Sequence, residues 1–246
     1  MRSNPPLLRR AVFVAVPLGL AGLLALSLLF SQGYALASLL FILLALLPFF
    51  ASFERRRPGA RDLVPIAVLA AVAALGRVLF APFPYVKPTS AVVIIAGVVF
   101  GPQAGFITGA AAALSSNIFF GQGPYTPWQM FAWGLMGFAA GFWGRLLPRL
   151  RSKAASAAFI CAAGFVSCFF YGWIMDLWQL LSFVSPITPL SALLTFAASF
   201  YFDFTHAAAT AVFLAALAPP WVRILGRVRR KYGLMEPEGG HLRGGA

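Results

Sequence analysis

Charge is scarce in this sequence, and negative charge is the scarcest. Only 10% of the 246 residues are charged, with six Asp or Glu against 19 Lys or Arg, whereas soluble domains carry about 25% charged residues. Because 61% of the residues are hydrophobic, one soluble core could not enclose the apolar surface, and we expect lipid to be the solvent. The basic excess does not indicate nucleic acid, since it is confined to short runs between apolar stretches, as in loops beside a membrane.

Cysteine and histidine are also rare, and this excludes several chemistries. Cys161 and Cys168 share one apolar stretch, where a helix would hold them roughly 10 Å apart, too far for a disulfide. No His, Cys or carboxylate side chains have the spacing of a metal site. The pattern G-x-x-x-x-G-K-[ST] is absent, so ATP is not bound in the P-loop manner. We therefore predict neither a metal nor a cofactor.

Long apolar stretches predict an all-α, polytopic membrane protein with eight transmembrane helices. The first stretch lacks a clear cleavage signature, so we expect a retained helix rather than a signal peptide. The fourth is short because Pro88, Gly101 and Pro102 bracket it. The predicted spans are residues 11–30, 35–53, 62–81, 89–101, 103–120, 127–145, 154–181 and 190–218.

The basic residues predict the orientation of these spans. With the N-terminus inside, every Lys and Arg except Arg77 and Lys87 falls in a segment on the inner side. We expect a multi-pass protein of the cell membrane with both termini in the cytoplasm. Residues 1–60 would form two leading helices and a polar hinge, residues 61–222 a six-helix domain, and residues 223–246 a tail that is basic and then disordered.

Small residues recur at helical spacing. The third span contains the A-x-x-x-A pairs Ala67/Ala71 and Ala70/Ala74, which let another helix approach closely. They predict either packing within this chain or a docking face for another membrane subunit. For the G-x-x-x-G pairs Gly105/Gly109 and Gly137/Gly141 we expect internal packing.

Polar residues gather toward the outer ends of the predicted spans. Polar groups in hydrocarbon are costly unless they face a cavity, a partner or a ligand. Their convergence predicts a pocket, open to the exterior, in which aromatic side chains stack on a solute and amides bond to it. The candidate substrate-binding residues are Arg77, Tyr85, Asn117, Gln122, Tyr125, Trp128, Gln129, Asp176, Gln179 and, deeper in the membrane, Asp203.

The charged residues within the spans leave alternatives open. Arg77 and Asp176 have similar predicted depths, so they would form an ion pair or hold polar groups of a ligand. Asp203 and His206 share one helix face and would form a proton relay, a ligand contact or an internal hydrogen bond. An intramembrane enzyme, such as a lipid transferase or protease, would use Asp176, Asp203 and His206. No nucleophile with an adjacent base stands out for such a reaction.

The pattern resembles the substrate-binding S component of an energy-coupling factor (ECF) vitamin transporter. The resemblance covers about residues 60 to 220. It consists of six core spans, Ala-x-x-x-Ala in the first, a Gly-rich stretch at Phe100–Gly105, and the segment Gly121–Met130, which is similar to a loop signature of some members. The two leading helices are an extension.

The resemblance implies a non-catalytic transport subunit. Such a protein binds a vitamin from outside and topples in the membrane to carry it inward. The face containing Ala67, Ala70, Ala71 and Ala74 would dock on a coupling membrane subunit, and two cytosolic ATPases would drive transport. No ligand motif of the thiamine, biotin or riboflavin members is present. Loops rich in aromatics and amides suit a large ligand of mixed polarity, so cobalamin or another corrinoid is the first candidate and a queuosine precursor the second.

Overall fold

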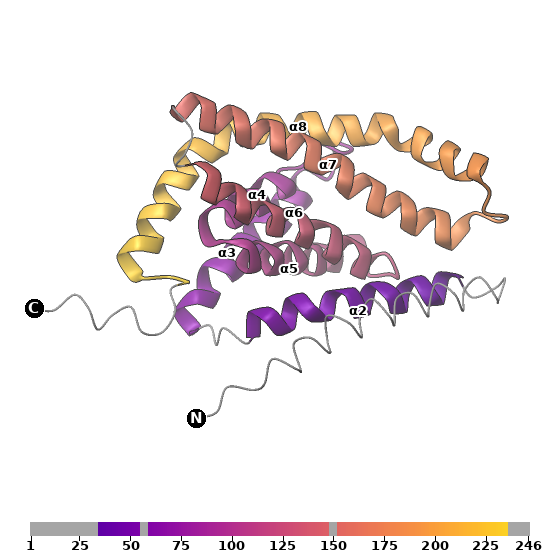
Figure 1. The fold of residues 1–246 in the computed structure, drawn as a ribbon, viewed down its shortest axis with the longest axis horizontal. Helices are drawn as coiled ribbons and strands as arrows, with labels where there is room; N and C mark the ends of the chain where they lie inside the picture. Colours follow the sequence, from indigo (N-terminus) through magenta and orange to yellow (C-terminus); the bar gives the residue numbers. More distant parts are fainter. Residues whose placement is uncertain (1–33, 55–58, 148–151, 236–246) are drawn as a thin grey trace, which may run out of the picture.

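The computed structural model describes residues 34–54, 59–147 and 152–235. These ranges form helices and no strand (Figure 1). The predicted all-α class is therefore confirmed for the part of the chain described. The helices are α2 (Tyr34–Glu54), α3 (Ala60–Leu79), α4 (Thr89–Phe100), α5 (Pro102–Phe120), α6 (Thr126–Leu146), α7 (Lys153–Phe183) and α8 (Pro189–Tyr232).

Capping residues explain where several helices begin and end. Ser152 Oγ accepts a hydrogen bond from Ala155 N at 3.0 Å at the start of α7, and Thr188 caps α8 in the same way through Ser191 N. Gly101 separates α4 from α5 with a φ of 94°, a conformation that disfavours other residues. Pro102 then begins α5, where its missing N–H costs nothing.

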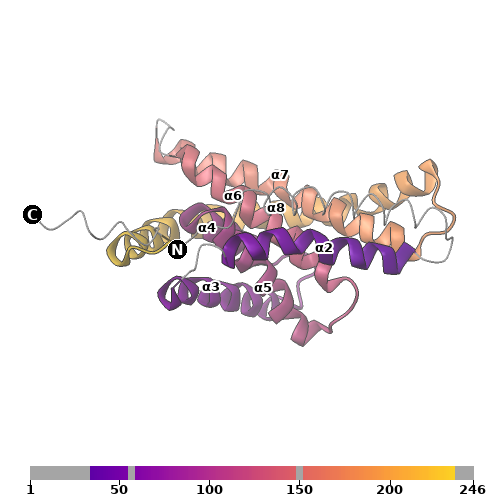
Figure 2. The same cartoon turned by 60° about the horizontal axis from the view of Figure 1, so that its bottom comes forward.

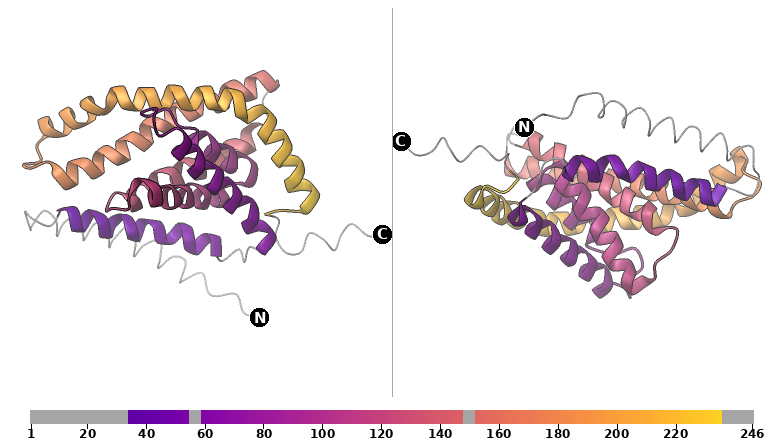
Figure 3. Two further views of the ribbon diagram at one scale, coloured as in Figure 1. Left: turned by 180° about the vertical axis from the view of Figure 1, so that it is seen from behind. Right: turned by 90° about the horizontal axis from the view of Figure 1, so that it is seen from below.

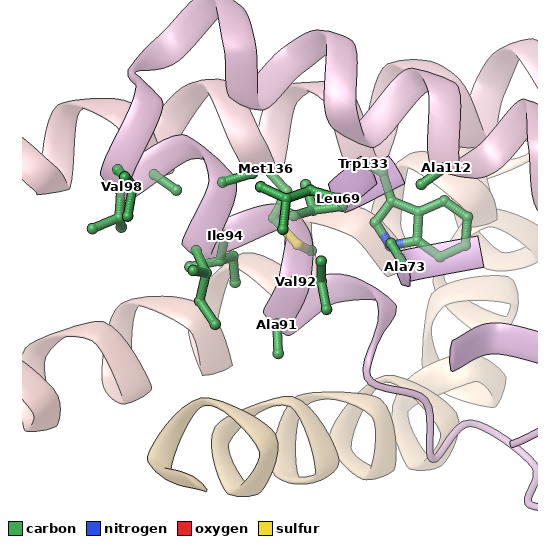
Figure 4. Packing of buried hydrophobic residues seen from close by; sticks show 14 of the residues in the cluster. Leu69, Ala73, Ala91, Val92, Ile94, Val98, Ala112, Trp133 and Met136 are labelled. Atoms are coloured by element: carbon green, nitrogen blue, oxygen red, sulfur yellow. The ribbon is translucent and has the colours of Figure 1, made fainter. Parts of the chain in front are cut away.

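Helix α4 is the centre of the bundle. All its residues are buried, and it contacts α3, α5, α6, α7 and α8. Its apolar side chains pack with Leu69 of α3 and with Trp133 and Met136 of α6 (Figure 4). Completely buried and only 12 residues long, α4 matches the short fourth span expected from its flanking glycine and prolines.

Glycines bring α4, α5 and α6 into close contact. A Cβ atom at Gly97 or Gly105 would overlap the backbone of Gly137, and one at Gly141 would overlap Pro102. No larger residue could keep these helices at the same distance. The G-x-x-x-G pairs therefore serve packing within the chain, as predicted.

Two peripheral features frame this bundle. α7 and α8 run side by side and extend beyond it as a long helical hairpin (Figures 1 and 3). α2 lies along the outside, where it contacts α5, α6 and α7 (Figures 2 and 3). Phe49 of α2 stacks on Phe106 of α5 with ring centroids 4.1 Å apart, so α2 is packed against the other helices.

The helix that contains the last predicted span continues beyond residue 218. α8 bends near Pro219 and Pro220 and continues to Tyr232 (Figure 1). Its last part packs on the core through the apolar side chains Trp221, Val222, Leu225 and Val228. This burial keeps the chain helical where two prolines would ordinarily end a helix.

The end of α8 is bonded to distant parts of the chain. Arg229 Nη1 donates to the carbonyl of Val99 at 2.6 Å, and Met235 N donates to Asp62 Oδ1 at 2.8 Å. Leu234 is buried. The segment predicted to be a basic and then disordered tail is thus ordered through residue 235, and residues 236–246 lie outside the described residues.

Three helices of the described part, α3, α7 and α8, are long and apolar enough to cross a membrane. The predicted span at residues 11–30 lies outside the described residues. The count of eight spans therefore remains a prediction, as does the division of the chain at residues 60 and 222.

Candidate ligand-binding cavity

A cavity of about 950 Å³ lies between α3, α4, α5 and α6 on one side and the α7–α8 hairpin on the other. This volume is at the upper end of the range for small-molecule sites, roughly 300–1,000 Å³. Most of the exposed surface of its walls is apolar, but more than half of the lining side chains carry a polar group. These are Arg77, Lys87, Thr89, Gln129, Asp176, Gln179, Thr195, Ser199, Asp203 and His206, together with the hydroxyl of Tyr85 and Tyr171 and the indole of Trp133.

The structure brings most of the predicted binding residues together. Those that line the cavity are Arg77, Tyr85, Gln129, Asp176, Gln179 and Asp203. Those that lie outside its lining are Asn117, Gln122, Tyr125 and Trp128. The contacts of the two groups differ accordingly.

Arg77 is held in place by the neighbouring helix α5. Its Nη1 atom donates to Ser116 Oγ and to Asn117 Oδ1, each at 2.6 Å. The guanidinium also lies over the rings of Phe120 and Trp133, with centroids at 4.7 and 5.0 Å. Because both bonds use Nη1, the donors on Nε and Nη2 are left for a ligand.

Asn117 connects Arg77 to Gln129. It is completely buried, and its Nδ2 donates to Gln129 Oε1 at 2.8 Å and to Thr126 Oγ1 at 3.0 Å. Since the oxygen of Gln129 is engaged, its amide nitrogen is the group free to donate into the cavity. Asn117 therefore orients two cavity residues without lining the cavity.

The loop between α3 and α4 closes one edge of the cavity. Lys87 Nζ donates to the carbonyls of Phe80 and Phe83 at 3.3 and 3.2 Å, and burial together with nearby Arg77 lowers the pKa of this lysine. Tyr85 has a φ of 60° and stacks on Phe202 of α8, with centroids 4.5 Å apart. The loop is thus connected to the helical hairpin.

The hairpin supplies two carboxylates. Asp176 of α7 is 8% exposed and accepts a hydrogen bond from Ser199 Oγ of α8 at 2.6 Å. Asp203, one turn further along α8 and 7% exposed, lies against Gly172, where a Cβ atom would overlap its carboxylate. Arg77 and Asp176 face the same cavity, but their bonds go to Ser116, Asn117 and Ser199 rather than to each other.

His206 belongs to a buried chain of hydrogen bonds. Its Nε2 lies 2.8 Å from Ser90 Oγ, which accepts a bond from Trp133 Nε1 at 3.0 Å. The ring of Tyr171 meets both His206 and Trp133, with centroids 5.3 and 4.8 Å away. Of the three roles expected for His206, the structure contains the internal hydrogen bond, and the ring also lines the cavity.

Sequence reasoning missed several of these residues. Trp133 lies one turn after Gln129 on α6, so helical spacing could have found it. Tyr171 precedes Asp176 by five residues, a spacing that does not indicate a shared helix face. Ser90 and Ser199 gave little signal, because a serine in a membrane helix usually bonds to its own backbone.

The other predicted residues shape the loop before α6. Gln122 Nε2 donates to the carbonyl of Leu114 at 2.9 Å, and Tyr125 donates to the carbonyl of Gly121. Trp128 is 2% exposed, and its Nε1 atom has no hydrogen-bond partner among the described residues. These contacts hold the loop in one shape.

The alanines of α3 divide between two faces. Ala70 and Ala74 are buried within the chain, whereas Ala67 and Ala71 are exposed. Apart from Arg61 near its start, the other exposed side chains on α3 are apolar and include Leu63, Val64, Val68, Val72 and Leu75. One A-x-x-x-A pair thus packs internally, and the other lies on an apolar outer surface.

A family model described as "ECF transporter, substrate-specific component" matches residues 61–222. The chain belongs to this family. The match begins in the first turn of α3 and ends in α8 after its prolines, so α2 and the end of α8 lie outside the matched region of this ECF substrate-specific component. No curated protein and no solved structure gives a significant match.

Membership makes this ECF component a membrane transport subunit that binds a substrate, and the enzyme alternative is not favoured. Asp176, Asp203 and His206 do line one cavity, but Asp176 and His206 are bonded to serines. Ser90, the serine beside His206, is completely buried and accepts from Trp133. A substrate could not reach this hydroxyl as it would a nucleophile.

Proposed function

We propose that this chain is the substrate-capturing subunit of an ATP-driven ECF importer for a vitamin or related micronutrient. The observation that carries the proposal is the cavity of about 950 Å³, in which side chains from α3, α6, α7 and α8 converge. Capture would need no catalysis by this chain. ATP hydrolysis would take place on two cytosolic ATPases.

The size of the cavity bears on the two candidate ligands. A corrinoid is larger than a drug-sized molecule and would have to extend through the mouth of the cavity. A queuosine precursor is a flat, purine-like heterocycle, and it matches a site that contains the rings of Trp133, Tyr171 and Phe120. We therefore place the queuosine precursor ahead of cobalamin.

The coupling subunit would dock on the outer face of α3. Ala67 and Ala71 are exposed there, beside Val64 and Val68. In lipid, close approach over small residues drives helix association better than hydrophobicity does. The proposed assembly lies in the cell membrane with both termini of this chain in the cytoplasm.

Thermal-shift measurements on the purified full-length protein test the proposal. A panel of vitamins and precursors is added in the micromolar range, and stabilisation by one compound identifies the ligand. Uptake of that compound is then measured in cells that contain the coupling subunit and the two ATPases. Absence of stabilisation across the whole panel, or uptake that does not require ATP, would contradict the proposal.

A further inference from the structure

The polar groups on the two sides of the cavity differ in charge and in hydrogen-bonding character. Hydrogen-bond donors come from the α3–α6 side, namely Arg77, Lys87 and the amide nitrogen of Gln129. The carboxylates come from the hairpin side, namely Asp176 and Asp203. A ligand that lies between these walls therefore meets positive charge on one side and negative charge on the other.

Neither carboxylate has a positively charged partner within the described residues. No lysine or arginine in the described ranges forms an ion pair with either of them. Asp176 has one neutral donor, Ser199 Oγ, and Asp203 lies against Gly172, which has no side chain to offer. Carboxylates buried to this degree are ordinarily paired.

His206 does not supply the missing positive charge. Its Nε2 atom lies 2.8 Å from Ser90 Oγ, which also accepts from Trp133 Nε1. Among the described residues His206 forms no ion pair with Asp176 or Asp203.

We infer that the ligand is a flat heterocycle with a cationic nitrogen, bound with this nitrogen toward Asp176 and Asp203. Its opposite edge carries acceptor atoms for Arg77 and Gln129. The ring lies beside Trp133 and Tyr171, two aromatic side chains that line the cavity. This inference rests on the proposed function and adds the charge of the substrate and its direction in the cavity.

A bound divalent cation is a weaker explanation of the two carboxylates. Among the described residues no group of three or more His, Cys, Asp or Glu side chains has the arrangement of a metal site. Arg77 and Lys87 line the same cavity and would repel a metal ion. An organic cation, with its charge at one end and acceptors at the other, avoids this repulsion.

Matched pairs of compounds test the inference on the full-length protein. Each pair differs in one group: the aminomethyl and cyano forms of deazaguanine, and pyridoxamine and pyridoxine. In the pair that binds to the protein, we expect the cationic compound to have a dissociation constant lower by about tenfold or more than its neutral counterpart. This is the effect on affinity expected of one charge-assisted hydrogen bond. Asp203→Asn and, independently, Asp176→Asn should reduce this preference.

The controls separate this inference from the proposed function. Asp62→Asn changes a buried carboxylate outside the cavity and should leave the preference intact, while melting temperature and size-exclusion profiles establish that each variant is folded. Tight binding of a neutral or anionic vitamin, or a cation preference that survives both cavity variants, overturns the inference and leaves the importer proposal standing. Failure to bind any vitamin overturns both.

Discussion

Arg77 Nη1 and Asn117 Oδ1 are 2.6 Å apart, and this bond joins α3 to α5 at the edge of the cavity. Asn117 is completely buried and also bonds to Gln129. One amide that never lines the cavity thus determines the positions of two side chains that do.

Replacing this amide should affect both stability and binding. Asn117→Ala removes an acceptor from a charged donor, so we expect a loss of roughly 1–3 kcal/mol in stability. Ligand affinity should fall as well, because Arg77 and Gln129 lose their orientation. Thermal unfolding and ligand titration measure the two effects. Gln122→Ala, which removes an exposed amide outside the cavity, is the control, and equal effects of the two substitutions would refute the role of Asn117.

Gly172 leaves room for the carboxylate of Asp203. In Gly172→Ala the new methyl group would overlap that carboxylate, so Asp203 must move, and we expect weaker ligand binding. Gly226→Ala is the matched control on a helix, because the only atom near its added Cβ is Arg230 Nη1 at 3.9 Å. That control should bind normally and be stabilised slightly by the helix propensity of alanine. Normal binding by Gly172→Ala would show that this contact is dispensable.

The two alanine pairs of α3 should respond differently to a larger side chain. Ala71 is exposed, so Ala71→Leu should fold and bind ligand normally but impair transport by obstructing the coupling subunit. Ala70 is 3% exposed, so Ala70→Leu should overfill the interior and destabilise the protein by about 1–3 kcal/mol. Melting temperature, ligand affinity and uptake distinguish these outcomes. Unimpaired transport by Ala71→Leu would remove this face from the docking proposal.

Asp62 connects the beginning of α3 to the end of α8. Its carboxylate accepts from Gly59 N at 3.2 Å and from Met235 N at 2.8 Å. We expect Asp62→Ala to release the segment after Pro220 and to accelerate its backbone hydrogen exchange, with little change in the exchange of α4. An unchanged exchange pattern would mean that the apolar contacts of Trp221 and Leu225 hold this segment without help.

Most helix boundaries could be predicted because their signals are local. Ser152, Thr188 and the pair Gly101–Pro102 act through their own backbone neighbourhoods. The continuation of α8 beyond Pro220 could not be predicted in this way. It depends on the burial of Trp221 and other side chains against helices far away in the sequence.

The candidate site was predictable to a similar extent. The predicted depth in the membrane groups Arg77, Gln129 and Asp176, and all three line one cavity. Depth does not reveal which side of a helix faces inward. Asn117 and Trp128 have a similar predicted depth, but they are buried and lie outside the cavity lining.

Helix α8 connects the cavity of the proposed ligand to α3, the helix on which the proposed coupling subunit would dock. The half of α8 before its prolines carries Asp203 and His206, and Arg229 near its end donates to Val99 of α4. Met235, just after α8, donates to Asp62 of α3. α3 is also the helix whose outer surface holds Ala67 and Ala71. A force that a coupling subunit applies to that surface would therefore reach Asp203 and His206 through α8, which would pivot at Pro219 and Pro220.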